Sequence, residues 1–291
     1  MNLDHFGMDT RSLAGPLEAK LRAMRAAGFT QVMLDAADVA GHPDGELAAV
    51  RVVRTSGLRV TGLQHLGDFE GLSGPLHAYK LDVAKALLEM CFALECHVLV
   101  VSSSTSAHAA GDIGLLTRHL QQLAMLAVPL NVRIAYEPLS WGRHICDIAQ
   151  AADLVQDADR ANLGLALDSF HWLVSGADLG ILDAVAPEQL FLVQLSDFMW
   201  QEVRSAHERI DTAQHLRAFP GEGAHSGELA GLARRLDDMG YRGDYSFEVF
   251  NDDYRQLPPP IVVQRARRAV KWVADHVSRR SLPARRSSLK T

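Results

Sequence analysis

The chain has 291 residues, of which 48% are hydrophobic and 22% charged, a composition typical of a folded globular protein with a large core. Its 29 basic and 35 acidic residues give a net charge of −6, which excludes a global electrostatic attraction to nucleic acid or anionic membranes. Three cysteines are too few for a disulfide framework, and no stretch approaches the roughly 18 apolar residues of a membrane span. We therefore expect a soluble cytoplasmic protein without a signal peptide, and its composition leaves a homo-oligomer open.

Strand-length apolar runs alternate along the chain with stretches of helical spacing. Eight runs predict strands, at residues 3–8 (a weak run), 32–34, 58–63, 98–101, 132–136, 163–167, 191–195 and 245–250. The clearest helical spacing falls at residues 17–24, 81–91, 116–127, 229–239 and 263–273. This alternation predicts a single (β/α)8 TIM barrel over residues 1–277. A doubly wound sheet is the rival, but its dinucleotide-binding form is disfavoured because no GxGxxG follows the first strand.

The last residues differ in composition from the rest of the chain. Residues 278–291 contain five basic side chains among serines and a proline, with almost nothing to bury. This pattern predicts a basic, disordered tail.

Oxygen-donor side chains stand at the ends of four consecutive predicted strands: Glu137, Asp168, Gln194 and Glu248. Active sites of TIM barrels lie at this end of the strands. Side chains alternate between the two faces of a strand, so all four donors share the parity that faces the barrel axis. The opposite parity places apolar residues toward the helices, for example Phe191, Val193 and Leu195 on the seventh strand.

Three carboxylates and one amide oxygen, without a thiolate, are typical ligands of a hard divalent cation such as Mg²⁺ or Mn²⁺, with Co²⁺ as a third candidate. Zinc would favour histidine or cysteine ligands. The alternative is an ion-pair network in which arginines at the top of the barrel neutralise these acids.

At these residues the sequence resembles the bacterial 3-dehydroshikimate dehydratases, within the xylose-isomerase-like TIM barrel superfamily. The matching motifs are DFEGL (68–72), YEPLSWGRH (136–144), LDSFH (167–171), FLVQLSDF (191–198), FPGEG (219–223) and YSFEVFNDDY (245–254). Two positions depart from the pattern of that family, which often has arginine where this chain has Gly67 and serine where it has Ala213.

The resemblance implies Glu137, Asp168, Gln194 and Glu248 as metal ligands, His171 as the acid/base residue and Arg217 as a clamp for the substrate carboxylate. It implies conversion of 3-dehydroshikimate to protocatechuate and water, as in quinate and shikimate breakdown, by removal of the α-proton, a metal-stabilised enolate and loss of the β-hydroxyl. Their strand-end or barrel-top positions make Gln64, Ser103 and Arg143 further candidates for substrate contact.

Other functions remain open on the same barrel. A sugar or keto-polyol isomerase or epimerase, or an inosose dehydratase, would use the same cation but has no need of a carboxylate clamp such as Arg217. An abasic-site endonuclease would require a histidine-rich set of ligands and a basic face, and neither is evident. A non-catalytic small-molecule-binding paralogue is the alternative of another class.

Overall fold

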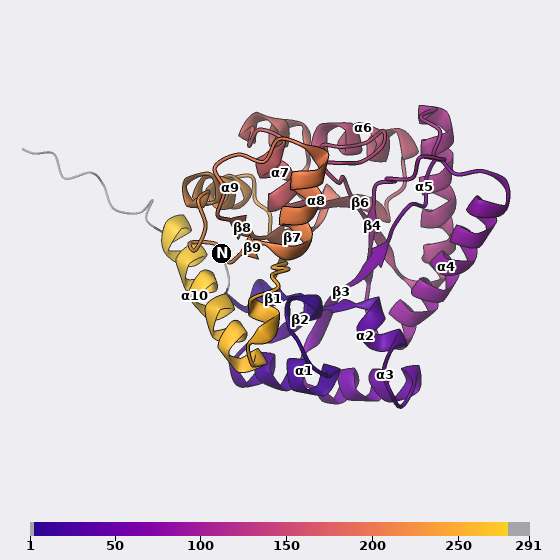
Figure 1. Ribbon diagram of the computed structural model, residues 1–291. Helices are drawn as coiled ribbons and strands as arrows, with labels where there is room; N and C mark the ends of the chain where they lie inside the picture. Colours follow the sequence, from indigo (N-terminus) through magenta and orange to yellow (C-terminus); the bar gives the residue numbers. More distant parts are fainter. Residues whose placement is uncertain (1–2, 279–291) are drawn as a thin grey trace, which may run out of the picture.

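The computed structural model describes residues 3–278 and consists of a parallel barrel surrounded by helices (Figure 1). The barrel strands are β1 (Phe6–Met8), β2 (Gln31–Asp35), β3 (Arg59–Leu66), β4 (Val98–Ser102), β5 (Arg133–Glu137), β6 (Leu163–Asp168), β7 (Leu190–Leu195) and β10 (Asp244–Phe247). The helices are α1 (Leu17–Ala26), α2 (Ala36–Ala40), α3 (Glu46–Thr55), α4 (Gly74–Ala93), α5 (Ile113–Ala127), α6 (Ile148–Ala158), α7 (Ser169–Val174), α8 (Ala206–His215), α9 (Ser226–Asp238) and α10 (Pro259–Ser278).

The strands follow the order β1-β10-β7-β6-β5-β4-β3-β2, and every neighbouring pair is parallel. A parallel bridge between Asp9 and Met33 joins the two ends of this order, so the barrel is nearly closed. The predicted (β/α)8 barrel is confirmed. From residue 279 on, the predicted basic tail 278–291 lies outside the described residues.

Apolar side chains pack on both sides of the strands. The larger core lies between the strands and helices, where α1 buries Leu17, Leu21 and Met24 as its spacing predicts. A smaller apolar cluster fills the barrel interior, namely Met33, Val98, Val100, Ala135, Ala166, Phe191 and Leu192. Above this layer the inward positions are polar, which places the site at the carboxyl ends of the strands.

One predicted orientation is wrong. Phe191 was expected to face the helices, but it packs in the interior cluster with Ala135 and Ala166. The register between β6 and β7 shifts at this point, because Leu165 pairs with Leu190 while Ala166 pairs with Leu192. The extra residue on β7 breaks the alternation of side chains.

The segment after β7 does not follow the simple strand–helix pattern. Two short strands, β8 (Asp197–Phe198) and β9 (Arg217–Ala218), pair antiparallel, with Phe198 opposite Arg217. Helix α8 lies between them in the chain, which makes residues 197–218 an excursion at the top of the barrel. The predicted strand 245–250 is also shorter in the structure, ending at Phe247, although the Glu248 amide still donates to the Leu195 carbonyl at 3.2 Å.

No helix among the described residues is long and apolar enough to cross a membrane.

Candidate active site

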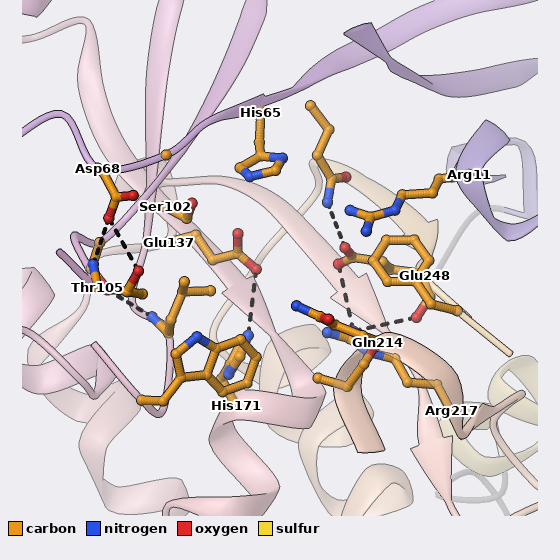
Figure 2. Close-up of a pocket in the computed structure, with 17 residues that line it drawn as sticks. Arg11, His65, Asp68, Ser102, Thr105, Glu137, His171, Gln214, Arg217 and Glu248 are labelled. Carbon is orange, nitrogen blue, oxygen red and sulfur yellow. Dashed lines mark hydrogen bonds and ion pairs between the residues drawn. The ribbon is translucent and has the colours of Figure 1, made fainter. Parts of the chain in front are cut away.

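A cavity of 240 Å³ opens at the carboxyl ends of the barrel strands (Figure 2). Six of the predicted site residues line it: Gln64, Ser103, Glu137, His171, Arg217 and Glu248. Two others, Asp168 and Gln194, are buried and contact members of this lining. Its volume lies below the roughly 300–1,000 Å³ of pockets that hold drug-sized ligands, so the cavity suits a small molecule.

Sheet register explains why residues distant in sequence meet here. Asp168 on β6 lies opposite Gln194 on β7, and Gln194 lies opposite Ser246 on β10, two residues before Glu248. Glu137 ends β5 opposite Ser102 on β4. Each of these side chains therefore reaches the same end of the barrel.

The four predicted metal ligands form two adjoining groups. One oxygen each from Glu137 and Asp168 and one ring nitrogen of His171 lie within 4.8 Å of one another, a spacing at which they could hold one cation. Glu248 accepts hydrogen bonds from the side-chain amides of Gln64 at 2.5 Å and Gln194 at 2.6 Å. Gln194 is fully buried, and its Oε1 has no hydrogen-bond partner among the described residues.

Arg217 bridges these two groups. Its Nη1 lies 2.7 Å from Asp168 Oδ2 and 3.6 Å from Glu248 Oε2, and its Nε donates to the Ala213 carbonyl at 2.8 Å. The ion-pair network considered from the sequence is thus present in part, but one guanidinium faces three buried carboxylates, those of Glu137, Asp168 and Glu248.

Burial and the excess of negative charge shift the pKa values of the carboxyl groups in the site. Burial and the neighbouring carboxylates Glu248 and Asp168 raise the pKa of Glu137 well above its ordinary value. Burial raises the pKa of Glu248 to about 7, against the opposing effect of Arg217. Burial also disfavours ionisation of Asp168, yet Arg217 and His171 hold its pKa below the ordinary value. The site therefore carries more acid groups than its own cation can compensate.

A divalent cation fits these residues. Ionised Glu137, Asp168 and Glu248 with Arg217 leave an excess of two negative charges. The unpartnered amide oxygen of Gln194 adds a neutral donor to the carboxylate oxygens, and hard divalent cations prefer such oxygens. An imidazole at the edge of the same group widens the choice toward borderline metals.

His171 is held by the loop that follows β5. Its Nδ1 accepts the backbone N–H of Ser140 at 3.0 Å and lies 3.1 Å from Ser140 Oγ. This bonding assigns the proton of the neutral ring to Nε2, which lies 4.0 Å from Glu137 Oε1 and 3.9 Å from Asp168 Oδ2. Burial lowers the pKa of His171 to about 4, so the imidazole is neutral at physiological pH.

Two acids of the loop after β3 fix the loops beside the cavity, and one of them, Asp68, lines it. Asp68 Oδ1 accepts the backbone N–H groups of Thr105 at 2.7 Å and Ser106 at 3.1 Å. Glu70 accepts the N–H of Ser104 at 2.5 Å and the hydroxyl of Tyr136 at 2.9 Å. These bonds tie the loop after β3 to the loop after β4. In the sequence, Asp68 and Glu70 stand out only within the DFEGL motif, although two acids directly after a strand are a signal that could indicate such a role.

The remaining candidates differ in their placement. Ser103 is buried in the lining and its hydroxyl accepts the N–H of Leu139 at 2.9 Å. Arg143 is exposed, is not among the lining residues, and donates its backbone N–H to the Ser104 carbonyl at 2.7 Å. Arg11 lines the cavity and Asp9 is buried nearby, and neither was singled out from the sequence because β1 is only three residues long.

Curated relatives match most of this chain. It is 39% identical over 251 residues to a 3-dehydroshikimate dehydratase of Pseudomonas aeruginosa and 33% identical over 249 residues to one of Pseudomonas putida. Both alignments cover 86% of this chain but only 38% of the relative, so the chain spans well under half the length of either. An inosose isomerase of Halalkalibacterium halodurans is 28% identical over 161 residues, 54% of each chain.

Solved structures show the same architecture. A xylose isomerase-like TIM barrel/4-hydroxyphenylpyruvate dioxygenase fusion protein superposes with a TM-score of 0.86 at 31% identity, covering 94% of this chain and 43% of that one. The IolI protein with a bound zinc atom superposes at 0.81 and 20% identity, covering 94% and 99%, and shows the fold alone. The family model described as xylose isomerase-like TIM barrel matches residues 21–276. The chain belongs to the xylose isomerase-like TIM barrel family.

Proposed function

We propose that this chain is a metal-dependent 3-dehydroshikimate dehydratase, a hydro-lyase that forms protocatechuate and water. The observation that carries the proposal is the buried group of three carboxylates and the unpartnered Gln194 oxygen, next to a neutral His171 and a buried arginine in one small cavity. The two Pseudomonas relatives of that name support the choice of substrate.

In this proposal Glu137, Asp168, Gln194 and Glu248 hold a divalent cation, with Mg²⁺ and Mn²⁺ favoured over Co²⁺. When bound, the cation supplies Lewis-acid stabilisation of the negative charge that develops on the ketone oxygen. The protein's own contribution is to present oxygens from four neighbouring strands without rearrangement.

His171 moves the proton. The ketone of 3-dehydroshikimate acidifies the neighbouring C–H, and the electron pair released by deprotonation expels the β-hydroxyl, which leaves as water once protonated. Nε2 faces the pocket but carries the proton of the neutral ring, because Nδ1 accepts the Ser140 N–H. For Nε2 to accept a proton, the ring proton must move to Nδ1, where the bond from the Ser140 N–H is exchanged for a bond to Ser140 Oγ, 3.1 Å away. Shift of a further proton then gives the aromatic ring of protocatechuate.

Arg217 orients the substrate. Its Nε and Nη1 are used by the protein, whereas its Nη2 has no partner among the described residues and is available to a carboxylate. Gln64 and Ser103 line the cavity beside it, and we propose that they contact substrate oxygens. Arg143 remains a candidate for substrate contact only if its exposed side chain folds over the mouth.

The inosose isomerase relatives support the main alternative, a keto-polyol isomerase on the same barrel. A neutral polyol has no carboxylate for the Arg217 guanidinium, so the dehydratase is the better explanation of the cavity.

The test offers 3-dehydroshikimate and an inosose separately to the protein loaded with Mg²⁺ or Mn²⁺, with protocatechuate followed by absorbance. Formation of protocatechuate, strongly reduced in Glu248→Gln, supports the proposal. Turnover of the inosose alone would assign the chain to the polyol enzymes. Absence of turnover of either substrate would favour the non-catalytic paralogue.

A further inference from the structure

Two arginines approach the same aromatic ring at the edge of the cavity. The guanidinium carbon of Arg11 lies 4.4 Å from the centre of the Phe250 ring, and that of Arg217 lies 5.3 Å from it. Both arginines line the cavity (Figure 2). Phe250 belongs to the same lining. Two positively charged groups therefore lie against the same aromatic ring in the cavity wall.

The charge of Arg217 is already engaged by the protein. Its Nη1 bonds Asp168 and lies near Glu248, and these ion pairs raise its pKa against the effect of burial. A substrate carboxylate that reaches Arg217 also approaches Glu248, which repels it. Arg217 alone is thus a weak binding group for a substrate carboxylate in addition to Asp168.

Arg11 is less engaged. Its nearest carboxylate oxygen is Asp35 Oδ2, 3.9 Å from Nε, which is beyond hydrogen-bond distance. Neither Nη1 nor Nη2 has a hydrogen-bond partner among residues 3–278. The side chain is 38% exposed, so a ligand in the cavity can reach these two groups.

The backbone around Arg11 is fixed. Thr10 and Ser12 are fully buried on either side of it. The Thr10 hydroxyl accepts the N–H of Asp35 at 3.0 Å, and the Ser12 hydroxyl accepts the N–H of Val249 at 3.0 Å. Arg11 is therefore held at the junction of β2 and β10, next to the residue that precedes Phe250, and its position does not depend on a mobile loop.

We infer that Arg11 binds the carboxylate of the substrate together with Nη2 of Arg217, across the Phe250 ring, and so selects acidic over neutral ring substrates. This inference rests on the proposed function for the identity of the substrate, but the geometry requires only a small ring that carries a carboxylate. Two guanidinium groups can each donate to one carboxylate oxygen, which fixes the orientation of the ring as well as its charge.

The experiment measures equilibrium binding of protocatechuate and of catechol, which lacks the carboxylate, to the metal-loaded protein by calorimetry. Arg11→Met removes the charge and keeps most of the apolar stem, Arg11→Lys restores a charge, and Arg51→Met removes an exposed arginine of α3 as a matched control. KM and kcat for 3-dehydroshikimate are measured on the same proteins.

We expect Arg11→Met to weaken protocatechuate binding about 10- to 100-fold, the loss of a charge-assisted hydrogen-bonded contact, and to leave catechol binding within about twofold. Arg11→Lys should recover part of the loss, Arg51→Met should show none, and KM should rise more than kcat falls. Equal losses for both ligands, or no loss for protocatechuate, would overturn the role of Arg11. So would a wild-type protein that binds catechol as tightly as protocatechuate. A wild-type protein that discriminates the two ligands through Arg11 but does not turn over 3-dehydroshikimate would refute the proposed reaction and leave the clamp intact.

Discussion

The metal-free protein should lose stability as the pH rises, and the substitution Glu248→Gln should remove part of that loss. The pKa of Glu248 is about 7 in the folded protein because of burial, compared with its ordinary value of 4.5. A carboxyl whose pKa is raised by folding binds its proton more tightly in the folded state, so the folded state loses stability as the pH rises from about 4.5 to above 7. The difference corresponds to about 3 kcal/mol for this single group.

Glutamine does not ionise, so this loss should be absent in the variant. The substitution replaces one carboxylate oxygen by an NH2 group and weakens the hydrogen bonds from Gln64 and Gln194. This loss of stability is the same at every pH. Between pH 5 and pH 8 the chelated wild type should lose about 2.5 kcal/mol more than the chelated variant, because part of the loss has already occurred at pH 5. In a barrel of this size the loss corresponds to roughly 5–10 °C in Tm.

Thermal and urea unfolding of both chelated proteins across this pH range measures the difference. Glu248 also raises the pKa of Glu137, so Glu248→Gln lessens the pH-dependent loss from Glu137 and adds to the difference in the same direction. Addition of the divalent cation at pH 8 should restore stability to the wild type and have little effect on the variant. Parallel pH profiles for the two chelated proteins would refute the electrostatic account of the site.

Three further substitutions test separate parts of the structure. Arg217→Met should destabilise the chelated protein by about 3–5 kcal/mol at pH 8 in urea unfolding, because Asp168 is left buried without its cation, and an unchanged midpoint would contradict this. His171→Ala should retain metal content and Tm while kcat for 3-dehydroshikimate falls about 10²- to 10⁴-fold; near-normal turnover would assign proton transfer to another group. Gly164→Ala should cost about 1–3 kcal/mol in thermal unfolding, because the added Cβ lies 2.5 Å from the Gln189 carbonyl and 2.7 Å from the Phe191 ring. Full stability of Gly164→Ala would contradict the interior position of Phe191.

The sequence was most informative where strands are regular. Alternation along β5, β6 and β7 predicted that Glu137, Asp168 and Gln194 face the barrel axis, and all three are buried at that end of the structure. The same rule failed for Phe191, because a shift in register between neighbouring strands leaves no mark in the pattern of a single strand.

Loop residues were harder to predict. The contact of Arg217 with Asp168 depends on the antiparallel pairing of β8 and β9, which brings the end of a 22-residue excursion, residues 197–218, back over the barrel. Arg11 follows a strand of only three residues, too short for a periodicity to reveal. Such tertiary contacts decide which charges meet, and local spacing does not encode them.

The central claim, that a divalent cation held by these strand ends drives dehydration, is tested most directly by metal removal and return. The purified protein is stripped with a chelator, then supplied separately with Mg²⁺, Mn²⁺ or Co²⁺ in the presence of 3-dehydroshikimate, and protocatechuate is followed by absorbance. We predict no product from the stripped protein and recovery of turnover with at least one of the three cations. Undiminished formation of protocatechuate by protein shown to be free of metal would contradict the account.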